Sequence, residues 1–311
     1  MIIDMHCHLY TWSMISDRYW DELVEIALDF FRKNNLGEPP KEEIRKNIMD
    51  PMMDPDGSKL FASMDAAGVD ISVILVTDWG YGIGEPEDTI DDINKVYGSI
   101  GKNYPDRIIP FAGVDPRRPG AVDILDRAVN DYGCKGLKYH PTSGFYPDGE
   151  ESYRVLEKAE ELGIPLLSHL GPISKPLKSK YAMPINLDAV VTDFPKLTVI
   201  GAHMAFSWWH QLVNLIAAKA TTFYADFSGM QVLARRNFGE FCHMLRAAFD
   251  EAGAEKFLWG TDNPILENVI PVKDWLQMVR ELPENAPDGL VFTKEEIEAV
   301  LGGNARKILN I

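Results

Sequence analysis

The sequence has few cysteines and no long hydrophobic segment. Its 311 residues include three cysteines, Cys7, Cys134 and Cys242, which lie far apart and form no Cys-x-x-Cys pair. This spacing predicts neither a disulfide framework nor a cysteine-based zinc site, and it suits a reducing compartment. No apolar run approaches the ~18 residues that a membrane span needs, and the N-terminus lacks the basic start and apolar core of a signal peptide. We therefore expect a cytoplasmic protein that does not enter a membrane.

Positive charge is also scarce. The chain has 31 lysines and arginines against 47 aspartates and glutamates, which gives a net charge of −16. Such a surface repels phosphate backbones and anionic lipids, so we expect neither nucleic acid nor a membrane surface as a partner. A small-molecule substrate is the expected partner, because a local metal and a few lysines can hold an anion on an acidic protein. A homodimer is the default expectation for the assembly.

The glycines at residues 80–84 do not form a phosphate-binding fingerprint, which disfavours a nucleotide-binding open sheet. Short apolar runs instead alternate with amphipathic stretches, as in buried parallel strands separated by helices. Eight such runs predict a single (β/α)8 TIM-barrel domain over residues 1–311, with a doubly wound sheet as the rival. The predicted strands are Ile2–His6, Ile71–Thr77, Ile108–Val114, Gly136–His140, Pro165–His169, Leu197–His203, Thr222–Phe227 and Phe257–Thr261.

Helical spacing of apolar residues predicts the elements between these strands. A possible capping box from Thr293 to Glu296 opens the last of them. The others are Ser58–Ala67, Asp88–Asn103, Pro119–Tyr132, Glu151–Leu162, Leu187–Phe194, His210–Ala220, Phe238–Ala252 and Val269–Glu281.

One segment, residues 10–57, departs from the repeat and follows the first strand. It contains Tyr10, Trp12, Tyr19 and Trp20, and it ends in a passage rich in proline, aspartate and methionine. An insertion after a barrel strand lies on the face that carries active sites. We interpret it as a lid or a wall of the substrate pocket; a packing or dimerisation appendage is the alternative.

Five of the seven histidines lie at or just after the end of a predicted strand. Parallel strand ends meet at one mouth of a barrel, so these side chains are expected to gather there. Residues i and i+2 of a strand point to one side, so a His-x-His pair can face the barrel axis while Cys7 packs outward as a small hydrophobe. The five are His6, His8, His140, His169 and His203.

Three imidazoles and one carboxylate suit zinc or another borderline divalent metal. Asp262 directly follows the last predicted strand, and His169 ends the fifth. An open position for water would make such a site catalytic, because the metal lowers the pKa of water toward ~7. Each residue alone has an ordinary alternative: Asp262 as a helix cap and His169 as a hydrogen-bonded core histidine.

The order of these residues resembles the amidohydrolase superfamily, in the branch that contains aminocarboxymuconate-semialdehyde decarboxylase and related aromatic-acid decarboxylases. The resemblance covers residues 2–309, and the insertion is its least matched part. The matching segments are Met1-Ile-Ile-Asp-Met-His-Cys-His8, Gly136-Leu-Lys-Tyr-His-Pro141, Leu167-Ser-His-Leu170, Gly201-Ala-His203, Trp259-Gly-Thr-Asp-Asn-Pro264 and Gly303-Asn-Ala-Arg-Lys-Ile-Leu309.

The resemblance implies one divalent metal, zinc being expected first and manganese, iron or cobalt being alternatives. It implies metal ligands at His6, His8, His169 and Asp262, and an acid/base role for His203 together with Asp262. In members with two metals, the position of His203 binds the second ion, and a carboxylated lysine near the position of Lys138 bridges the two.

Four further residues are candidates for substrate binding. Lys138 and His140 share a strand face, and the lysine can pair with a substrate carboxylate or with a barrel carboxylate. Trp208 follows the sixth strand and suits an unsaturated substrate or simple packing. Arg235 follows the seventh strand and suits carboxylate capture or a solvated surface position. Asp4, counted onto the face of His6, is expected either to bond a ligand histidine or to be satisfied by backbone.

The reaction stays open at this point. In one version, a metal-activated water attacks a carbonyl or lactone, with Asp262 taking its proton and His203 polarising the oxygen. In the other, a small carboxylate loses carbon dioxide without oxidation, and the same two residues manage the proton. A metal-independent lactonase-like enzyme and a non-catalytic metal-containing barrel are the alternatives.

Overall fold

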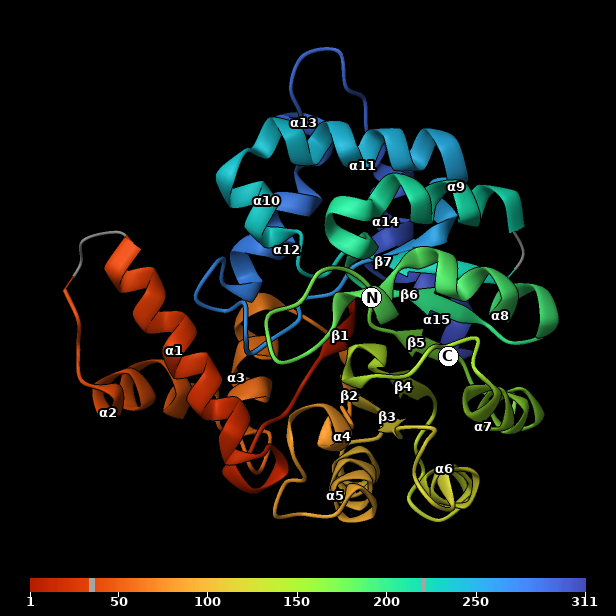
Figure 1. Cartoon of the computed structure of the whole chain (residues 1–311). Helices are drawn as coiled ribbons and strands as arrows, with labels where there is room; N and C mark the ends of the chain where they lie inside the picture. The colour runs from red at the N-terminus through yellow and green to blue at the C-terminus, as the bar shows by residue number, and fades with distance from the viewer. Residues whose placement is uncertain (34–36, 220–221) are drawn as a thin grey trace.

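Eight parallel strands form a TIM barrel in the computed structural model, which describes residues 1–33, 37–219 and 222–311 (Figure 1). The strands follow one another around the sheet in sequence order, and each pairs with the next in parallel. The predicted barrel is confirmed, and the rival open sheet is wrong. The strands are β1 (Ile3–Cys7), β2 (Ile71–Leu75), β3 (Ile108–Gly113), β4 (Leu137–Tyr139), β5 (Leu166–Ser168), β6 (Val199–Gly201), β7 (Phe223–Asp226) and β8 (Phe257–Leu258).

The barrel closes through the residues that follow the two-residue strand β8. The amide of Met5 donates to the carbonyl of Trp259 at 3.1 Å, and the amide of His8 donates to the carbonyl of Asn263 at 2.7 Å. The amide of Asp262 donates to the carbonyl of His6 at 2.7 Å. The first and last strands are therefore joined at the mouth by the segment that carries Asp262.

Alternation along the strands separates the barrel interior from the helix layer. Ile71, Val73 and Leu75 of β2 belong to an apolar cluster made almost entirely of strand residues, whereas Ile74 belongs to the larger cluster shared with the helices. Side chains of a strand point to opposite faces in turn, so this division follows from a period of two. The same period points the polar residues at the strand ends into the mouth.

Strand β1 breaks this period. Its register against β2 shifts between Asp4 and Cys7, and Ile3 and Met5 belong to the interior cluster. Cys7 belongs to the outer cluster, as expected. An irregularity of this kind re-aims the following side chains, so His6 faces the mouth although Met5 precedes it in the interior.

The helices lie where the sequence predicts them, with ends that differ by at most three residues. Thr293 and Glu296 form the predicted capping box, and the predicted end of one helix at Ala220 lies outside the described residues. The helices are α3 (Ser58–Ala67), α5 (Ile90–Asn103), α6 (Ala121–Asn130), α7 (Glu150–Glu161), α8 (Asp188–Asp193), α9 (Trp209–Lys219), α11 (Phe238–Ala252), α12 (Val272–Arg280) and α14 (Lys294–Glu298).

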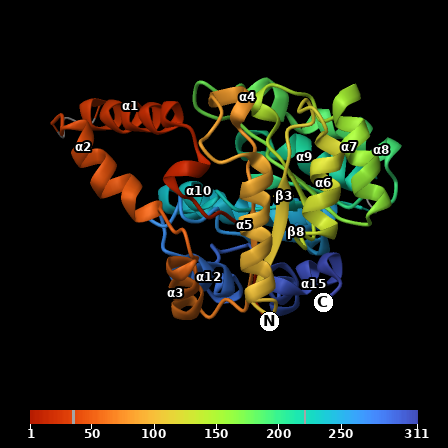
Figure 2. The same cartoon turned by 90° about the horizontal axis from the view of Figure 1, so that it is seen from below.

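The insertion after β1 forms α1 (Asp17–Lys33) and α2 (Lys41–Ile44), and its residues 34–36 lie outside the described part. Figure 2 shows α1 and α4 (Gly80–Ile83) at the end of the barrel opposite both chain termini. The insertion is therefore on the side of the strand ends. Within the described ranges, no helix has both the length and the hydrophobicity of a membrane span.

Candidate metal centre

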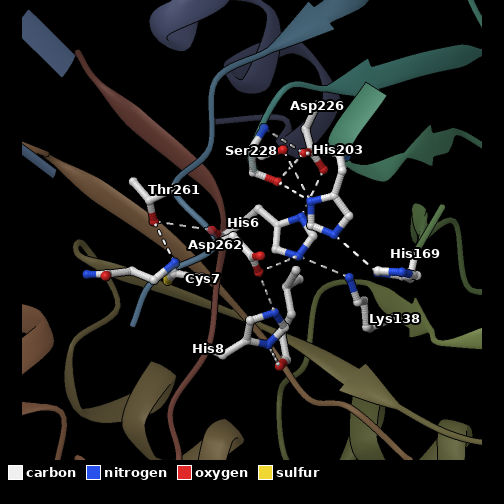
Figure 3. Close-up of polar contacts among 12 residues, drawn as sticks. His6, Cys7, His8, Lys138, His169, His203, Asp226, Ser228, Thr261 and Asp262 are labelled. Carbon is white, nitrogen blue, oxygen red and sulfur yellow. Dashed lines mark hydrogen bonds and ion pairs between the residues drawn. The ribbon is translucent and has the colours of Figure 1, made fainter. Parts of the chain in front are cut away.

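Polar side chains from six strand ends meet at the barrel mouth (Figure 3). They are almost completely buried, although four of them are imidazoles and one is an ammonium group: His6 is 0% exposed and Lys138 1%. Buried polar groups of this kind need partners, which makes their hydrogen bonds informative. The residues are His6 from β1, His8 directly after β1, Lys138 from β4, His169 after β5, His203 after β6, Asp226 from β7 and Asp262 after β8.

The ring of His6 is fixed by Asp226. Its Nδ1 donates to Oδ2 of Asp226 at 2.9 Å, so its Nε2 presents a lone pair to the mouth, 3.7 Å from Oδ1 of Asp262. Burial, then the charge of Lys138 and then His8, hold the pKa of His6 well below its usual range. The imidazole is therefore neutral, which is the form that binds a metal.

The ring of His8 is fixed by the backbone. Its Nδ1 donates to the carbonyl of Leu75 at 2.8 Å, and its Nε2 lies 3.4 Å from Oδ1 of Asp262. A divalent cation held between this nitrogen and the carboxylate oxygen would attract both. Donors that share one ion at ~2.1 Å each lie roughly 3–3.5 Å apart, so this spacing fits a shared ion.

A chain of hydrogen bonds fixes His203 and His169 in turn. The hydroxyl of Ser228 donates to Oδ1 of Asp226. Nδ1 of His203 faces that hydroxyl at 2.9 Å and the Ser228 carbonyl at 3.2 Å, and a carbonyl only accepts, so this nitrogen donates. Nε2 of His203 then accepts from Nδ1 of His169 at 3.1 Å. Nε2 of His169 is left with a lone pair and is a buried atom without a partner among the described residues.

The three predicted ligand histidines therefore all have an Nε2 lone pair toward the mouth, and that of His6 accepts from Nζ of Lys138 at 3.1 Å. The ligand atoms of His6, His8 and Asp262 lie within 4.8 Å of one another, and His169 offers its unpartnered Nε2 without belonging to that trio. A second group, His6 with His203 and Asp226, also lies within 4.8 Å, but hydrogen bonds to Asp226 already hold it together. The donor chemistry of the first trio and the free nitrogen of His169 suit one divalent ion.

Asp262 and His203 have left-handed backbone, with φ of 54° and 59°. Residues other than glycine adopt this conformation rarely and at a cost, often at functional sites. Burial alone raises the pKa of Asp262, but His203, His8 and Lys138 outweigh it and lower that pKa. The carboxylate, with a side chain 16% exposed, is thus ionised at the mouth.

Asp226 was not predicted as a site residue, yet it hydrogen-bonds three residues of the mouth, His6, His203 and Ser228. It bonds the ring of His6, accepts the backbone N–H of His203 at 3.1 Å and accepts both the backbone and the hydroxyl of Ser228. The signal that identified the histidines also applied to it, because Asp226 is a polar residue at the end of a strand.

Asp4 does not bond a ligand ring. Its carboxylate accepts the amides of His6 and Thr261, each at 3.0 Å, and the hydroxyl of Thr261 at 2.6 Å. The bond to a ligand histidine is thus not formed, and the alternative expectation, a buried carboxylate satisfied by backbone, is confirmed. Burial raises the pKa of Asp4 to about 7, although the bonds from Thr261 and His6 oppose this.

Lys138 reaches the centre of the mouth, where Nζ lies 3.1 Å from Nε2 of His6. Burial lowers its pKa to about 8, with the charges of Asp226 and Asp262 opposing the shift. The described residues include no carboxylate within 4 Å of Nζ, so the salt bridge considered as its alternative role is not formed. His140 bonds the Thr142 hydroxyl at 2.7 Å.

The other two candidates for substrate binding lie differently. Trp208 is half-buried and packs against the outer hydrophobic cluster. Arg235 is exposed and donates to the carbonyls of Asn268 and Val269 in the loop after β8. Among the described residues, neither forms a hydrogen bond or a ring contact with the mouth histidines. Their role in substrate binding stays a prediction.

A pocket of about 270 Å³ opens beside the mouth, between the end of the insertion, α3 and the loop after β8; His8, Lys59 and Asn263 line it. A larger cavity of about 810 Å³ lies at the opposite end of the barrel, beside Met1 and Arg280. It contains none of the strand-end histidines, so its size does not mark the site of chemistry.

Residues 3–311 match the family model described as Amidohydrolase. The chain belongs to the amidohydrolase family. The resemblance inferred from the motifs is thereby confirmed over nearly the whole chain. No curated protein matches the chain in sequence.

Several solved structures share the fold. 5-Carboxyvanillate decarboxylase from Sphingomonas paucimobilis is 18% identical, with a TM-score of 0.67 over 100% of this chain and 99% of its own. An uncharacterised TIM-barrel protein from Bordetella bronchiseptica is 20% identical, with a TM-score of 0.67 over 99% and 98% of the two chains. A dihydroxybenzoic acid decarboxylase from Polaromonas sp. JS666, with bound manganese and the inhibitor 2-nitroresorcinol, is 17% identical, with a TM-score of 0.65 over 99% and 96%.

At these identities the likeness shows a common fold. The family match and the histidine–aspartate cluster identify an enzyme of the amidohydrolase family. The amidohydrolase mouth is suited to a divalent metal and a small-molecule substrate.

Proposed function

We propose that this amidohydrolase-family enzyme removes carbon dioxide from a small organic carboxylate without oxidation. The observation that carries the proposal is the Lys138 ammonium, which is buried among imidazoles, bonds Nε2 of His6 at 3.1 Å and has no carboxylate within 4 Å among the described residues. A buried cation without an anionic partner is costly, and a substrate carboxylate removes that cost. The proposed ligands of one divalent ion are His6, His8, His169 and Asp262.

When bound, the ion supplies Lewis-acid charge that stabilises negative charge on the substrate oxygens. Zinc suits three imidazoles and a carboxylate; manganese accepts similar donors and is the ion in the Polaromonas structure. We favour one ion, because Nε2 of His203 is engaged by His169.

The chain's own residues hold the substrate and exclude water. Lys138 pairs with the carboxylate, and the buried rings around it provide a dry setting, in which a carboxylate loses its hydration and carbon dioxide leaves as a neutral molecule. The carbon–carbon bond breaks, its electron pair stays on the carbon, and that carbon takes up one proton. One proton is consumed from solvent for each carbon dioxide released.

We assign the proton to Asp262 and His203. Asp262 is the more exposed of the two, so solvent protons reach it first. Nε2 of His203 accepts from His169, so His203 acts as a proton carrier only when that hydrogen bond opens. His203 is the main neighbour that lowers the pKa of Asp262, so protonation of one residue affects the other.

Isotope labelling tests the reaction. We would offer aromatic and unsaturated carboxylates, lactones and amides in D2O enriched in H2¹⁸O. Decarboxylation places deuterium on the carbon that loses carbon dioxide and leaves the rest of the product free of ¹⁸O. A product that gains ¹⁸O without carbon dioxide release would establish hydrolysis instead. Asp262→Asn should lose activity, and Asp91→Asn, which alters an outer carboxylate paired with Arg127, should keep it.

Metal analysis tests the ligands separately. About one ion per chain, lost in Asp262→Asn, supports the proposal; about two would assign His203 and a carboxylated Lys138 to a second ion. No metal, even after zinc or manganese is added, would contradict it and favour a metal-independent lactonase-like enzyme. We further propose that residues 10–57 form a wall of the substrate pocket within one domain. The homodimer and the cytoplasmic location stay predictions.

A further inference from the structure

Aromatic rings from two separate segments pack against histidines of the mouth. The ring of Tyr10, in the insertion, stacks on His8 with centroids 5.7 Å apart and 9° between the planes. Trp79, which follows β2, stands edge-on to His140 at 5.1 Å and 86°. Tyr10 and Trp79 lie 6.5 Å apart, so together they extend from one side of the imidazole group to the other. Flat apolar surfaces of this kind favour a flat ligand.

Each ring carries one polar atom that forms no hydrogen bond with the described residues. The hydroxyl of Tyr10 and the indole nitrogen of Trp79 are buried and have no hydrogen-bond partner among the described residues. Tyr10 is 3% exposed and Trp79 6%. Buried tyrosine and tryptophan side chains usually find a partner for these atoms, so two unused donors side by side call for an explanation.

Other buried aromatic residues of this chain are satisfied in part. The hydroxyl of Tyr97 donates to the carbonyl of Leu9 at 2.6 Å and accepts its amide at 3.0 Å. The indole of Trp275 donates to the carbonyl of Gly260 at 3.0 Å. The indole nitrogens of Trp20 and Trp259 also have no partner among the described residues, so Tyr10 and Trp79 are distinguished by their ring contacts with the mouth histidines.

Both rings lie next to proposed site residues. Tyr10 stacks on His8, whose Nε2 lies 3.4 Å from Oδ1 of Asp262. Trp79 stands edge-on to His140, which stacks on His169 with centroids 4.2 Å apart. The ring of Tyr19 lies 4.9 Å from that of Trp79 and supports it from the insertion side.

We propose that Tyr10 and Trp79 form a donor pair that selects a flat substrate with an acceptor oxygen away from its carboxylate. The inference rests on the proposed function, since it takes the carboxylate to be held beside Lys138. A carbonyl, nitro or ether oxygen, or a second carboxylate, satisfies both donors. A site built to bond such an oxygen rejects an analogue that lacks it, because its donors stay buried and unpaired.

Matched pairs of benzoates test the selection. 3-Acetyl- and 4-acetylbenzoate carry an acceptor oxygen, and 3-isopropyl- and 4-isopropylbenzoate are similar in shape without one. Affinity is measured by calorimetry on the metal-loaded full chain. For the isomer that fits, we expect acetyl to bind at least about tenfold more tightly than isopropyl. Tyr10→Phe and Trp79→Phe keep the rings and should each bring the ratio toward one.

Tyr97→Phe is the matched control. It also removes one buried hydroxyl, but from a satisfied pair, so it should lower the melting temperature and leave the acetyl-to-isopropyl ratio unchanged. Tyr10→Phe and Trp79→Phe should leave the melting temperature of the ligand-free protein within about 2 °C of the parent, because no bond within the protein is lost.

Three outcomes would overturn the inference: no preference for acetyl in the parent protein, an unchanged ratio in both variants, or a fall in melting temperature like that of Tyr97→Phe. The last would mean that a structural partner such as a buried water holds these atoms. The proposed function fails differently. If the acetyl preference is present and lost in the variants while no acid releases carbon dioxide, the donor pair stands and decarboxylation does not.

Discussion

Asp226 and His6 are joined across the barrel mouth by a hydrogen bond of 2.9 Å between two completely buried side chains. The same carboxylate also holds Ser228, through which it reaches His203 and then His169. One aspartate on β7 thus sets the orientation of two proposed ligands on β1 and beyond β5. Carboxylate partners of this kind fix the tautomer and raise the basicity of a metal-binding imidazole.

We therefore expect Asp226→Asn to weaken metal binding by about 10- to 100-fold. Ser228→Ala should have a smaller effect, because it disturbs only the path to His203 and His169. Competition with a chelator of known affinity measures both variants, and circular dichroism confirms that they fold. Equal losses in the two variants would contradict the view that the bond to His6 dominates.

Lys138→Met should weaken the binding of carboxylate inhibitors by about 10- to 100-fold, since a hydrogen bond to a charged group is lost at constant side-chain volume. Removing the ammonium also removes a charge that depresses the pKa of His6. The control is Lys135→Met, an exposed lysine three residues earlier. Inhibition constants for benzoate, compared with those for benzamide, measure the effect; parallel losses for both compounds would argue against a charge pair.

The stability of the protein should depend on pH through Asp4. Its pKa is raised from 3.8 to about 7 in the folded state, so the folded chain binds more protons than the unfolded chain between these values. Stability from this residue is therefore present at low pH and is lost as the pH rises from about 4 to about 7. The full difference is about 4 kcal/mol at about 1.4 kcal/mol per pH unit. Urea unfolding of Asp4→Asn should lack this slope, and an identical slope in both proteins would exclude Asp4 as its source.

The mouth histidines should make the stability of the protein depend on pH in the opposite direction. Burial, more than neighbouring charge, holds the pKa values of His6, His140, His169 and His203 well below the usual 6.5. The unfolded chain then binds more protons, so their stabilisation is complete above about pH 6.5 and is lost as the pH falls below it. Each contributes up to about 1.4 kcal/mol per pH unit. In chelator, His140→Phe should unfold less steeply with acid than the parent protein; an unchanged slope would contradict this.

The sequence predicted the barrel and the gathering of the histidines because both follow from local rules. Apolar runs such as Ile71–Leu75 have the length and β-branching of buried strands, and parallel strand ends always meet at one mouth. The predicted ligands needed only their position at these ends. Whether His6, His8, His169 and Asp262 bind a metal is a separate question, which metal analysis decides.

Contacts that depend on register or on distant ring packing could not be predicted. The shift in β1 is a property of its pairing with β2, so the sequence could not decide between the two expected roles of Asp4. Arg235 follows β7 in sequence, yet its guanidinium donates to backbone carbonyls of the loop after β8. The stacking of Tyr10 on His8 depends on how the insertion folds back, and no local pattern encodes that path.

The closure of the barrel has a consequence for synthesis of the protein. The amide of Asp262 bonds the carbonyl of His6, and Thr261 bonds Asp4, 257 positions away in the chain. During translation, β1 therefore emerges long before β8 and the segment after it have been made. Until then, His6 and His8 lie beside an unpaired sheet edge. The cluster can assemble only when the last sixth of the chain has left the ribosome. A nascent chain that lacks this last sixth keeps the polar residues of five strand ends but has neither a closed barrel nor Asp262 to complete the cluster.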